Sequence, residues 1–246
     1  MSVKLIYITP LWLIANGIRY SHDNHYLSDS ENILFIYNIK DKDFNEEFNG
    51  IGSKDFDLIK RVGFKMKHES VLRHSLIVFE LEASRALLQE LSRHCVGVEP
   101  TVKSTRYTLM KDLKNEESFY METSVKNIYI YDYRKAEKYV VLTSNQETNN
   151  YIIDALENLR LLLKDNISND IAKYALPEAF KFKGQYSFNL QSLIHLLELR
   201  INKDVLPEFQ KLCADMVDVL PDDYKELVLT NEKIRTNYER IKNENT

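Results

Sequence analysis

Apolar residues recur at helical spacing through the second half of the chain. The clearest stripe predicts a helix over residues 145–165. Its inward positions are Ile152, Leu156, Leu159 and Leu163. Further helices are predicted over residues 12–18, 53–68, 84–94, 168–176, 189–200, 206–219 and 222–242. Ser53, Ser84 and Ser168 precede three of these stripes and are expected to cap the helices that follow.

Runs rich in β-branched and aromatic residues predict strands. In chain order they cover residues 3–9, 32–39, 76–81, 104–109 and 181–188. The apolar runs 125–131 and 139–142 are ambiguous between strand and helix. Residues 20–52 are expected to form a polar loop with an acidic insertion, and residues 240–246 a frayed tail. Because no repeat or linker interrupts the pattern, one α+β domain over residues 1–246 is the simplest organisation.

Composition narrows the class of protein. Apolar residues make up 44% and charged residues 28% of the chain, which is typical of an ordinary globular protein. The formal charge of -4 gives no general nucleic-acid footprint, so no nucleic-acid partner is expected and any phosphate recognition must be local. No apolar run approaches the length of a membrane span, and the first residues read as a strand instead of a signal peptide. The two cysteines argue against a disulfide scaffold, so we expect a cytoplasmic protein without a membrane partner.

Residues 91–108 hold the most concentrated chemistry. A predicted helix ends there, a loop with Gly97 and Pro100 follows, and a β-like run begins. The functional groups are Arg93 and His94 before the loop, and Ser104, Arg106 and Tyr107 after it. Guanidinium forks and hydroxyl groups suit phosphate, so these residues are expected to form an anion-binding corner. The alternative is a helix-to-strand connection with solvated basic side chains.

Other residues have competing interpretations. Cys95, beside two basic residues, is either an activated nucleophile or a small packing residue. His22 and His25 are either a metal pair or part of a polar loop, and no further cluster of ligands accompanies them, so no metal is expected. Arg200 either complements a helix dipole or faces a ligand, and His195 on the same helix is by default half-buried and satisfied. Gly-rich phosphate loops and a G-x-S-x-G motif are absent from the sequence.

The chain resembles the flavin-dependent thymidylate synthases. The family motif is R-H-R, seven residues, Ser, and usually R-Y two residues further on. Here it reads Arg93-His94 followed by Ser104-Thr-Arg106-Tyr107, in the form found in ε-proteobacterial members. Other segments resemble the family in the same order, namely residues 84–94, 155–160, 170–178 and 189–200. The resemblance covers residues 53–225 and is weak over residues 20–52.

The resemblance implies a fold and an activity. The fold is a mixed or antiparallel sheet flanked by long helices, and the assembly is a homotetramer with shared active sites. The activity is reductive methylation of dUMP at C5, with FAD as cofactor and with NADPH and methylenetetrahydrofolate as co-substrates. A pyrimidine deoxynucleotide monophosphate is therefore the expected small-molecule partner.

The resemblance also assigns residues by position. Ser104, Arg106, Tyr107 and Lys173 are expected to bind the nucleotide. Arg200 is expected to face the uracil as the catalytic residue and to stabilise charge that develops on the ring. The flavin side is expected to be formed by His74, Arg93, His94, Asn189 and His195.

Several positions depart from the family pattern, mostly on the flavin side. Cys95 stands where the family has the second Arg of R-H-R, and eight residues separate it from Ser104. Arg73 replaces a Glu, and Gln191 replaces the Arg of the N-A-R segment. Three functions stay open: a working thymidylate synthase, a paralogue with altered chemistry such as hydroxymethylation or another nucleotide substrate, and a non-catalytic nucleotide-binding homologue that has lost FAD.

Overall fold

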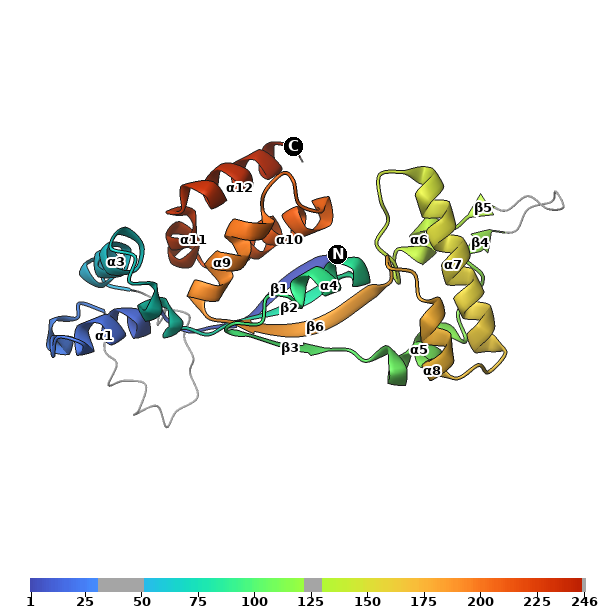
Figure 1. Ribbon diagram of the computed structural model, residues 1–246, viewed down its shortest axis with the longest axis horizontal. Helices are drawn as coiled ribbons and strands as arrows, with labels where there is room; N and C mark the ends of the chain where they lie inside the picture. Colours follow the sequence, from blue (N-terminus) through green and yellow to red (C-terminus); the bar gives the residue numbers. More distant parts are fainter. Residues whose placement is uncertain (31–50, 122–129, 245–246) are drawn as a thin grey trace. The chain divides into compact units, whose positions relative to one another are not determined.

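The computed structural model describes residues 1–30, 51–121 and 130–244, which form two compact units (Figure 1). The first unit comprises Met1–Ser2, Leu81–Arg93 and Thr101–Gln185. The second unit comprises Val3–Glu80, His94–Pro100 and Tyr186–Thr246. Each unit therefore draws on segments that are distant in sequence.

A four-stranded sheet has its strands in the order β1-β2-β6-β3. The strands are β1 (Ser2–Ile8), β2 (Ile77–Ser84), β6 (Lys181–Phe188) and β3 (Val98–Val102). Hydrogen bonds at the strand ends are Thr9 N to Leu76 O (3.0 Å), Arg85 N to Phe180 O (2.9 Å) and Lys103 N to Lys183 O (2.8 Å). Each joins the end of one strand to the start of its neighbour, so neighbouring strands run antiparallel. The predicted α+β class with an antiparallel sheet and flanking helices is confirmed.

In the first unit, α7 (Gln146–Lys164) is the longest helix and confirms the prediction over residues 145–165. Around it are α4 (Arg85–Leu91), α5 (Thr105–Leu113), α6 (Tyr133–Ala136), α8 (Asn169–Ala172), the 3₁₀ turn η5 (Lys173–Ala175) and the hairpin of β4 (Tyr120–Met121) and β5 (Ile130–Tyr131). The buried core holds Leu109, Leu113, Phe119, Ala136, Val140, Ile153, Leu156, Leu159, Leu163, Ala172 and Phe180. Helices α5, α6 and α8 all contact α7, whose apolar stripe thus organises this core.

The second unit is mainly helical. Its elements are α1 (Trp12–Tyr20), η1 (His25–Leu27), α3 (Ser53–Ile59), the π-helix η3 (Lys60–Lys65), η4 (Glu69–Arg73), α9 (Leu190–Arg200), α10 (Pro207–Asp218), α11 (Asp222–Leu229) and α12 (Glu232–Glu244). Helix α9 is central, because Leu193, Leu196 and Leu197 are fully buried and the helix contacts η4, α10 and α12. The predicted helices over residues 12–18, 189–200 and 206–219 are confirmed within two residues at each end.

Three element predictions were wrong, and one of them is the loop expected around Pro100, which lies in β3 (Val98–Val102). Residues 104–109 form the start of α5 instead of a strand, because Leu109 and Leu113 lie one turn apart and are both fully buried in the core. Packing of that stripe overrides the β-propensity of the neighbouring Thr and Tyr residues. The single helix predicted over 222–242 is two helices: the first ends at Leu229, and the Asn231 side-chain oxygen accepts from the N–H groups of Lys233 (3.1 Å) and Ile234 (3.3 Å) at the start of the second.

The predicted caps had different outcomes. The Ser84 hydroxyl accepts from Leu87 N at 3.1 Å, which confirms it as the N-cap of α4. Ser53 is instead the first residue of α3, and Asp29 accepts from the N–H groups of Lys54 (2.8 Å) and Asp55 (3.0 Å). Ser168 is the N-cap residue of α8, but its side chain makes no capping hydrogen bond.

Asp55 fastens the chain on both sides of the undescribed segment 31–50. Its fully buried carboxylate pairs with Arg19 (2.5 Å) and accepts from the hydroxyls of Ser28 (2.5 Å) and Ser30 (2.6 Å). The Ser30 hydroxyl in turn accepts from Gly52 N at 3.1 Å. Ser30 and Gly52, on the two sides of this segment, therefore lie together, and we call Ser30, Gly52 and Asp55 the neck.

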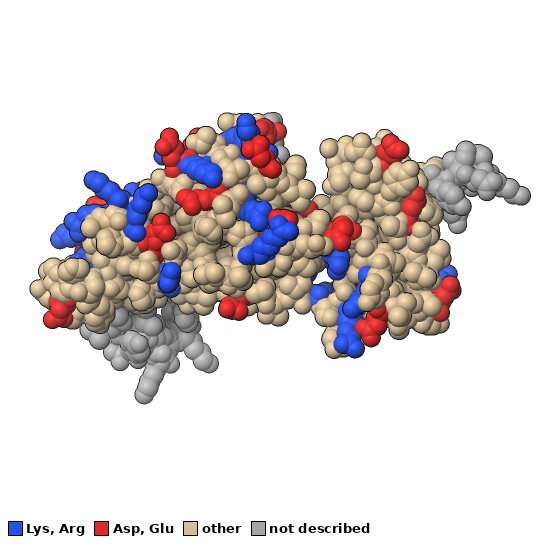
Figure 2. Space-filling view, in the orientation of Figure 1, with Lys and Arg blue, Asp and Glu red and all other residues tan. Residues whose placement is uncertain are grey.

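Some sequence predictions lie wholly or partly outside the described residues. These are the strand over 32–39, most of the insertion within 20–52, most of the run 125–131 and the last two residues of the tail. Within the described ranges, no helix is long and apolar enough to cross a membrane. Lys and Arg side chains are interspersed with Asp and Glu over the visible face (Figure 2).

Candidate functional site

A basic cavity of about 400 Å³ lies in the first unit. Its lining residues are Arg85, Leu88, Val102, Lys103, Ser104, Thr105, Arg106, Lys173, Lys181 and Phe182. Three of the residues predicted to bind the nucleotide, Ser104, Arg106 and Lys173, are thus brought together. Tyr107 is 75% exposed and is not among the lining residues, although the Arg106 guanidinium lies 5.8 Å from its ring centroid.

Local structure explains how these side chains meet. Strand β3 ends at Val102, and Ser104 is the N-cap residue of α5, so Arg106 lies in the first turn of that helix. Asn169 ties this turn to α8, because its amide donates to Arg106 O (2.9 Å) and its oxygen accepts from Met110 N (2.8 Å). Lys173 follows α8 directly. The Asn169 bridge therefore sets the spacing between Arg106 and Lys173.

The cations of the basic cavity fall into two groups. Three have carboxylate partners: Lys103 pairs with Asp112 (2.5 Å), Arg106 with Asp170 (2.9 Å) and Lys181 with Glu82 (3.1 Å). Within the described ranges, Arg85 and Lys173 form no ion pair with a carboxylate. Five cations and three carboxylates leave an excess of positive charge, which suits an anion. Sequence reasoning missed Arg85 and Lys181, since no local pattern marks them as neighbours of Ser104.

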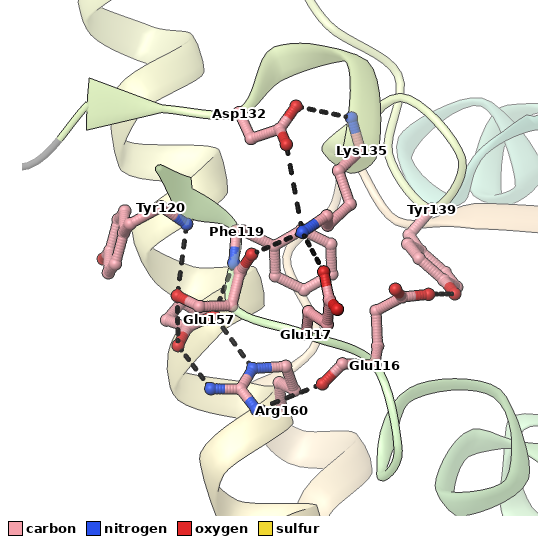
Figure 3. A network of polar contacts seen from close by, with 10 residues as sticks. Glu116, Glu117, Phe119, Tyr120, Asp132, Lys135, Tyr139, Glu157 and Arg160 are labelled. Carbon is pink, nitrogen blue, oxygen red and sulfur yellow. Dashed lines mark hydrogen bonds and ion pairs between the residues drawn. The ribbon is translucent and has the colours of Figure 1, made fainter. Parts of the chain in front are cut away.

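A polar network supports the loop that packs against α7 (Figure 3). Glu157 and Arg160 form a buried pair at 2.6 Å, with side chains 7% and 8% exposed. Glu157 also accepts from Phe119 N (3.0 Å) and the Ser118 hydroxyl (3.2 Å). Burial by itself raises the pKa of Glu157, but these hydrogen bonds and the guanidinium outweigh burial and lower it below its ordinary value. Residues 155–160, which resemble a family segment, therefore include a buried structural pair.

The same network reaches Tyr139 (Figure 3). Its hydroxyl donates to the Glu116 carboxylate at 2.5 Å, and this hydrogen bond lowers the pKa of Glu116. Burial, together with the adjacent carboxylate, raises the pKa of Tyr139, which therefore stays protonated and donating. Tyr139 also lines a smaller cavity of about 220 Å³ that shares Lys103 and Lys181 with the basic cavity.

In the second unit, Arg200 and His94 are in direct contact. The Arg200 Nε–H donates to His94 Nε2 at 2.9 Å, so this ring nitrogen is unprotonated in that hydrogen bond. The guanidinium lies 5.3 Å from the Phe209 ring centroid, and the His94 and His195 rings are 6.4 Å apart edge to face. Residues assigned to the uracil and to the flavin thus form one cluster, although His195 itself is exposed.

The loop after His94 is fixed on the start of α9. The Ser192 hydroxyl donates to Val96 O at 2.8 Å, and Asn189 caps the helix by accepting from Ser192 N at 2.9 Å. Gly97 has a φ of +66°, and a Cβ there would clash with Asn189 and Ser192. Glycine is therefore required at this position both for backbone conformation and for space. Cys95, next to this loop, is exposed.

Two departures from the family pattern meet in the second unit. The Arg73 Nε–H donates to the Gln191 side-chain oxygen at 2.6 Å, and the Gln191 amide donates to Glu69 at 3.2 Å. Gln191 and Glu69 also line a wider cavity of about 700 Å³. The Arg73 guanidinium therefore lies beside Gln191, at the position where the family motif has an Arg.

The remaining predicted flavin residues are placed separately. His74 is exposed, and its ring lies against Gly17 of α1, where an added Cβ would approach the ring to 2.6 Å. Arg93 belongs to the first unit, is 69% exposed and pairs with Glu90 at 3.1 Å. Among the described residues, no three His, Cys, Asp or Glu side chains are grouped as a metal site would require.

The chain matches known proteins over most of its length. The family model for thymidylate synthase complementing protein matches residues 5–222. A flavin-dependent thymidylate synthase of Campylobacter jejuni is 44% identical over 175 residues, which are 71% of this chain and 79% of that protein. The same enzyme of Wolinella succinogenes is 41% identical over 189 residues, or 76% and 87% of the two chains. A crystal structure of thymidylate synthase X from Helicobacter pylori with FAD and dUMP superposes with a TM-score of 0.78 at 36% identity, covering 95% of this chain and 99% of that one.

Proposed function

The chain belongs to the flavin-dependent thymidylate synthase family, and from that premise we propose that it catalyses the reductive methylation of dUMP at C5. The observation that carries the proposal is the basic cavity, which gathers three residues assigned to the nucleotide by position. Its excess of positive charge suits the phosphate of a pyrimidine deoxynucleotide monophosphate. Related proteins of known structure were crystallised with FAD and dUMP.

Ser104, Arg106 and Lys173 hold the nucleotide phosphate in this proposal. Ser104 offers a hydroxyl, and the first N–H groups of α5 lie next to it. Arg106 exchanges its exposed pair with Asp170 for the stronger charge of a phosphate, and Lys173 contributes a point charge. Tyr107 lies outside the cavity lining, so its proposed place is beside the nucleotide and not around the phosphate.

Arg200 faces the uracil ring of dUMP in this proposal. An anionic, electron-rich uracil ring makes C5 nucleophilic, and a preorganised guanidinium stabilises that negative charge. His94 orients this guanidinium by accepting from Nε, and Phe209 packs against its plane. Both contacts restrict Arg200 before the substrate arrives, so little reorganisation is needed during the reaction.

The donor chemistry of the second unit fits FAD, a cofactor rich in carbonyl and phosphate oxygens. Arg73, His74, Asn189 and His195 supply N–H donors. When bound, FAD supplies the hydride chemistry that connects NADPH with the transferred one-carbon unit. The chain's own residues bind and orient the reactants, with methylenetetrahydrofolate as the carbon donor. We further propose a homotetramer located in the cytoplasm.

The test is to express the chain, record its visible spectrum and assay dTMP formation. A yellow protein that makes dTMP from dUMP, NADPH and methylenetetrahydrofolate, and that rescues a thymidine auxotroph, is the expected result. The Arg200→Gln variant is expected to bind dUMP and to lose most of the turnover. A colourless protein that takes up no added FAD would refute the proposal. Mass spectrometry of products from dUMP and dCMP would then distinguish altered chemistry, which the changes at Cys95 and Gln191 would favour, from a non-catalytic homologue.

A further inference from the structure

Arg85 is an unexpected member of the basic cavity. It is the first residue of α4, directly after the capping Ser84, and the helix carries no acidic residue in its first turn. A cation at a helix N-terminus is opposed by the helix dipole, so this position is not chosen for helix stability. The Arg85 guanidinium therefore does not stabilise α4 through the helix dipole.

The backbone of Arg85 is held firmly. Its N–H donates to Phe180 O at 2.9 Å, and the next N–H, of Ala86, donates to Glu178 O at 3.0 Å. With the Ser84 cap, these bonds fix the start of α4 against the strand start that also carries Lys181 and Phe182. The Arg85 side chain, which lines the basic cavity, is therefore attached to a firmly held backbone.

The Nε–H of Arg85 is a buried donor. Within the residues that the structure describes, it donates to no hydrogen-bond acceptor. A buried donor without a partner costs about 1–3 kcal/mol, and a bound ligand that accepts from it would remove this cost. Neighbouring Lys103, Arg106 and Lys181 have carboxylate partners, whereas Arg85 and Lys173 pair with no carboxylate among the residues that the structure describes.

We propose that Arg85 is a phosphate-binding residue that acts together with Lys173 as a charge clamp. This inference rests on the proposed function and adds a residue to its nucleotide site. A phosphate monoester carries a charge of about -1.5 to -2 at pH 7, which the two unpaired cations match. Arg85 contributes a planar guanidinium that can donate two hydrogen bonds to phosphate, and Lys173 contributes a compact positive charge. The cations that already have carboxylate partners add to the positive potential around them. The clamp selects nucleotides over nucleosides.

The experiment measures binding of dUMP, dCMP, deoxyuridine and inorganic phosphate to the purified full chain by calorimetry. The variants are Arg85→Met, Lys173→Met and the double variant. Arg134→Met and Lys111→Met are matched controls, because both residues are exposed in the first unit and lie outside the lining of the basic cavity. Arg85→Met is expected to weaken dUMP binding about 10- to 100-fold, the range for a lost hydrogen bond to a charged group, and to leave deoxyuridine binding unchanged. The controls are expected to bind as the unmodified chain does.

The results separate the proposed role of Arg85 and Lys173 from the proposed substrate dUMP. If the unmodified chain prefers dCMP or binds phosphate without preferring dUMP, and Arg85→Met weakens that binding, the clamp stands and the proposed substrate is wrong. If Arg85→Met binds phosphate ligands as well as the unmodified chain does, or if no phosphate ligand binds at all, the clamp is refuted. Should Arg85→Met fail to fold, Arg85→Lys replaces it in the same binding measurements, because Lys keeps the positive charge and removes only the planar guanidinium. An unchanged preference for dUMP over deoxyuridine in Arg85→Gln, with an intact melting temperature, would likewise refute it.

Discussion

Removing the guanidinium of the buried pair in α7 should unfold the first unit more easily. In Arg160→Met, Glu157 keeps its bonds to Phe119 N and the Ser118 hydroxyl but loses its counter-charge in a site where it is 7% exposed. Breaking a buried pair on one side costs about 3–5 kcal/mol, because the remaining charge is uncompensated. With a urea dependence of about 1–3 kcal/mol/M, the unfolding midpoint should fall by roughly 1–5 M. Circular dichroism measures this shift, and exchange of the Phe119 amide should accelerate with it.

Two comparisons test the reasoning about Arg160. The double variant Glu157→Gln/Arg160→Met retains an acceptor for Phe119 N without a buried charge, so its loss should be clearly smaller than that of Arg160→Met. Lys164→Met, an exposed position on the same helix, should change the midpoint little. If Arg160→Met and Lys164→Met behaved alike, or if the double variant were the least stable, the pair would not have the assigned role.

The pH dependence of the same pair has a definite sign. The pKa of Glu157 is lowered on folding from its ordinary value of 4.5, so ionised Glu157 stabilises the folded state above that value. This contribution is lost as the pH falls through the lowered pKa. As the pH falls below about 5, the free energy of unfolding of Arg160→Met should decrease less than that of the unmodified chain. Acid titrations followed by circular dichroism measure this difference.

The remaining predictions concern the second unit. Gly97→Ala should destabilise the loop on α9 by about 1–3 kcal/mol and reduce turnover, since φ is +66° and a Cβ clashes; an unchanged melting temperature would contradict this. Thiol titration of the native protein should detect Cys95, which is exposed, and not Cys213, whose pKa is raised by complete burial; two thiols should react only after unfolding. Asp55→Asn should leave the Arg19 charge without its buried partner and cost about 3–5 kcal/mol, measurable by urea unfolding.

Where one face of an element is buried, the sequence predicted it well. The stripe of α7 and the alternation of β6 are local patterns, and the structure buries those faces. The run 104–109 misled because Thr105, Tyr107 and Thr108 favour strands, whereas the deciding contacts of Leu109 and Leu113 come from α7, far along the chain. The break at Asn231 carried a readable cap that the continuous apolar pattern concealed.

The candidate site was predictable only in part. Ser104, Arg106 and Lys173 were assigned by family resemblance, and the structure brings them to one cavity. Arg85 has no local pattern that marks it, because its role depends on which distant cations already have carboxylate partners. The contact between Arg73 and Gln191 is similar: each substitution reads as a loss in sequence, and only their proximity shows that a cation is kept beside position 191.

The neck has a consequence for what the chain can tolerate. Ser30 and Gly52 are joined by a hydrogen bond, and Asp55 also holds Ser30, so contacts among described residues fix both sides of the neck. Doubling the length of a closed loop costs only about 0.6 kcal/mol in closure entropy. We therefore expect an epitope or a small reporter domain inserted between Ser30 and Gly52 to leave the contacts of the neck in place.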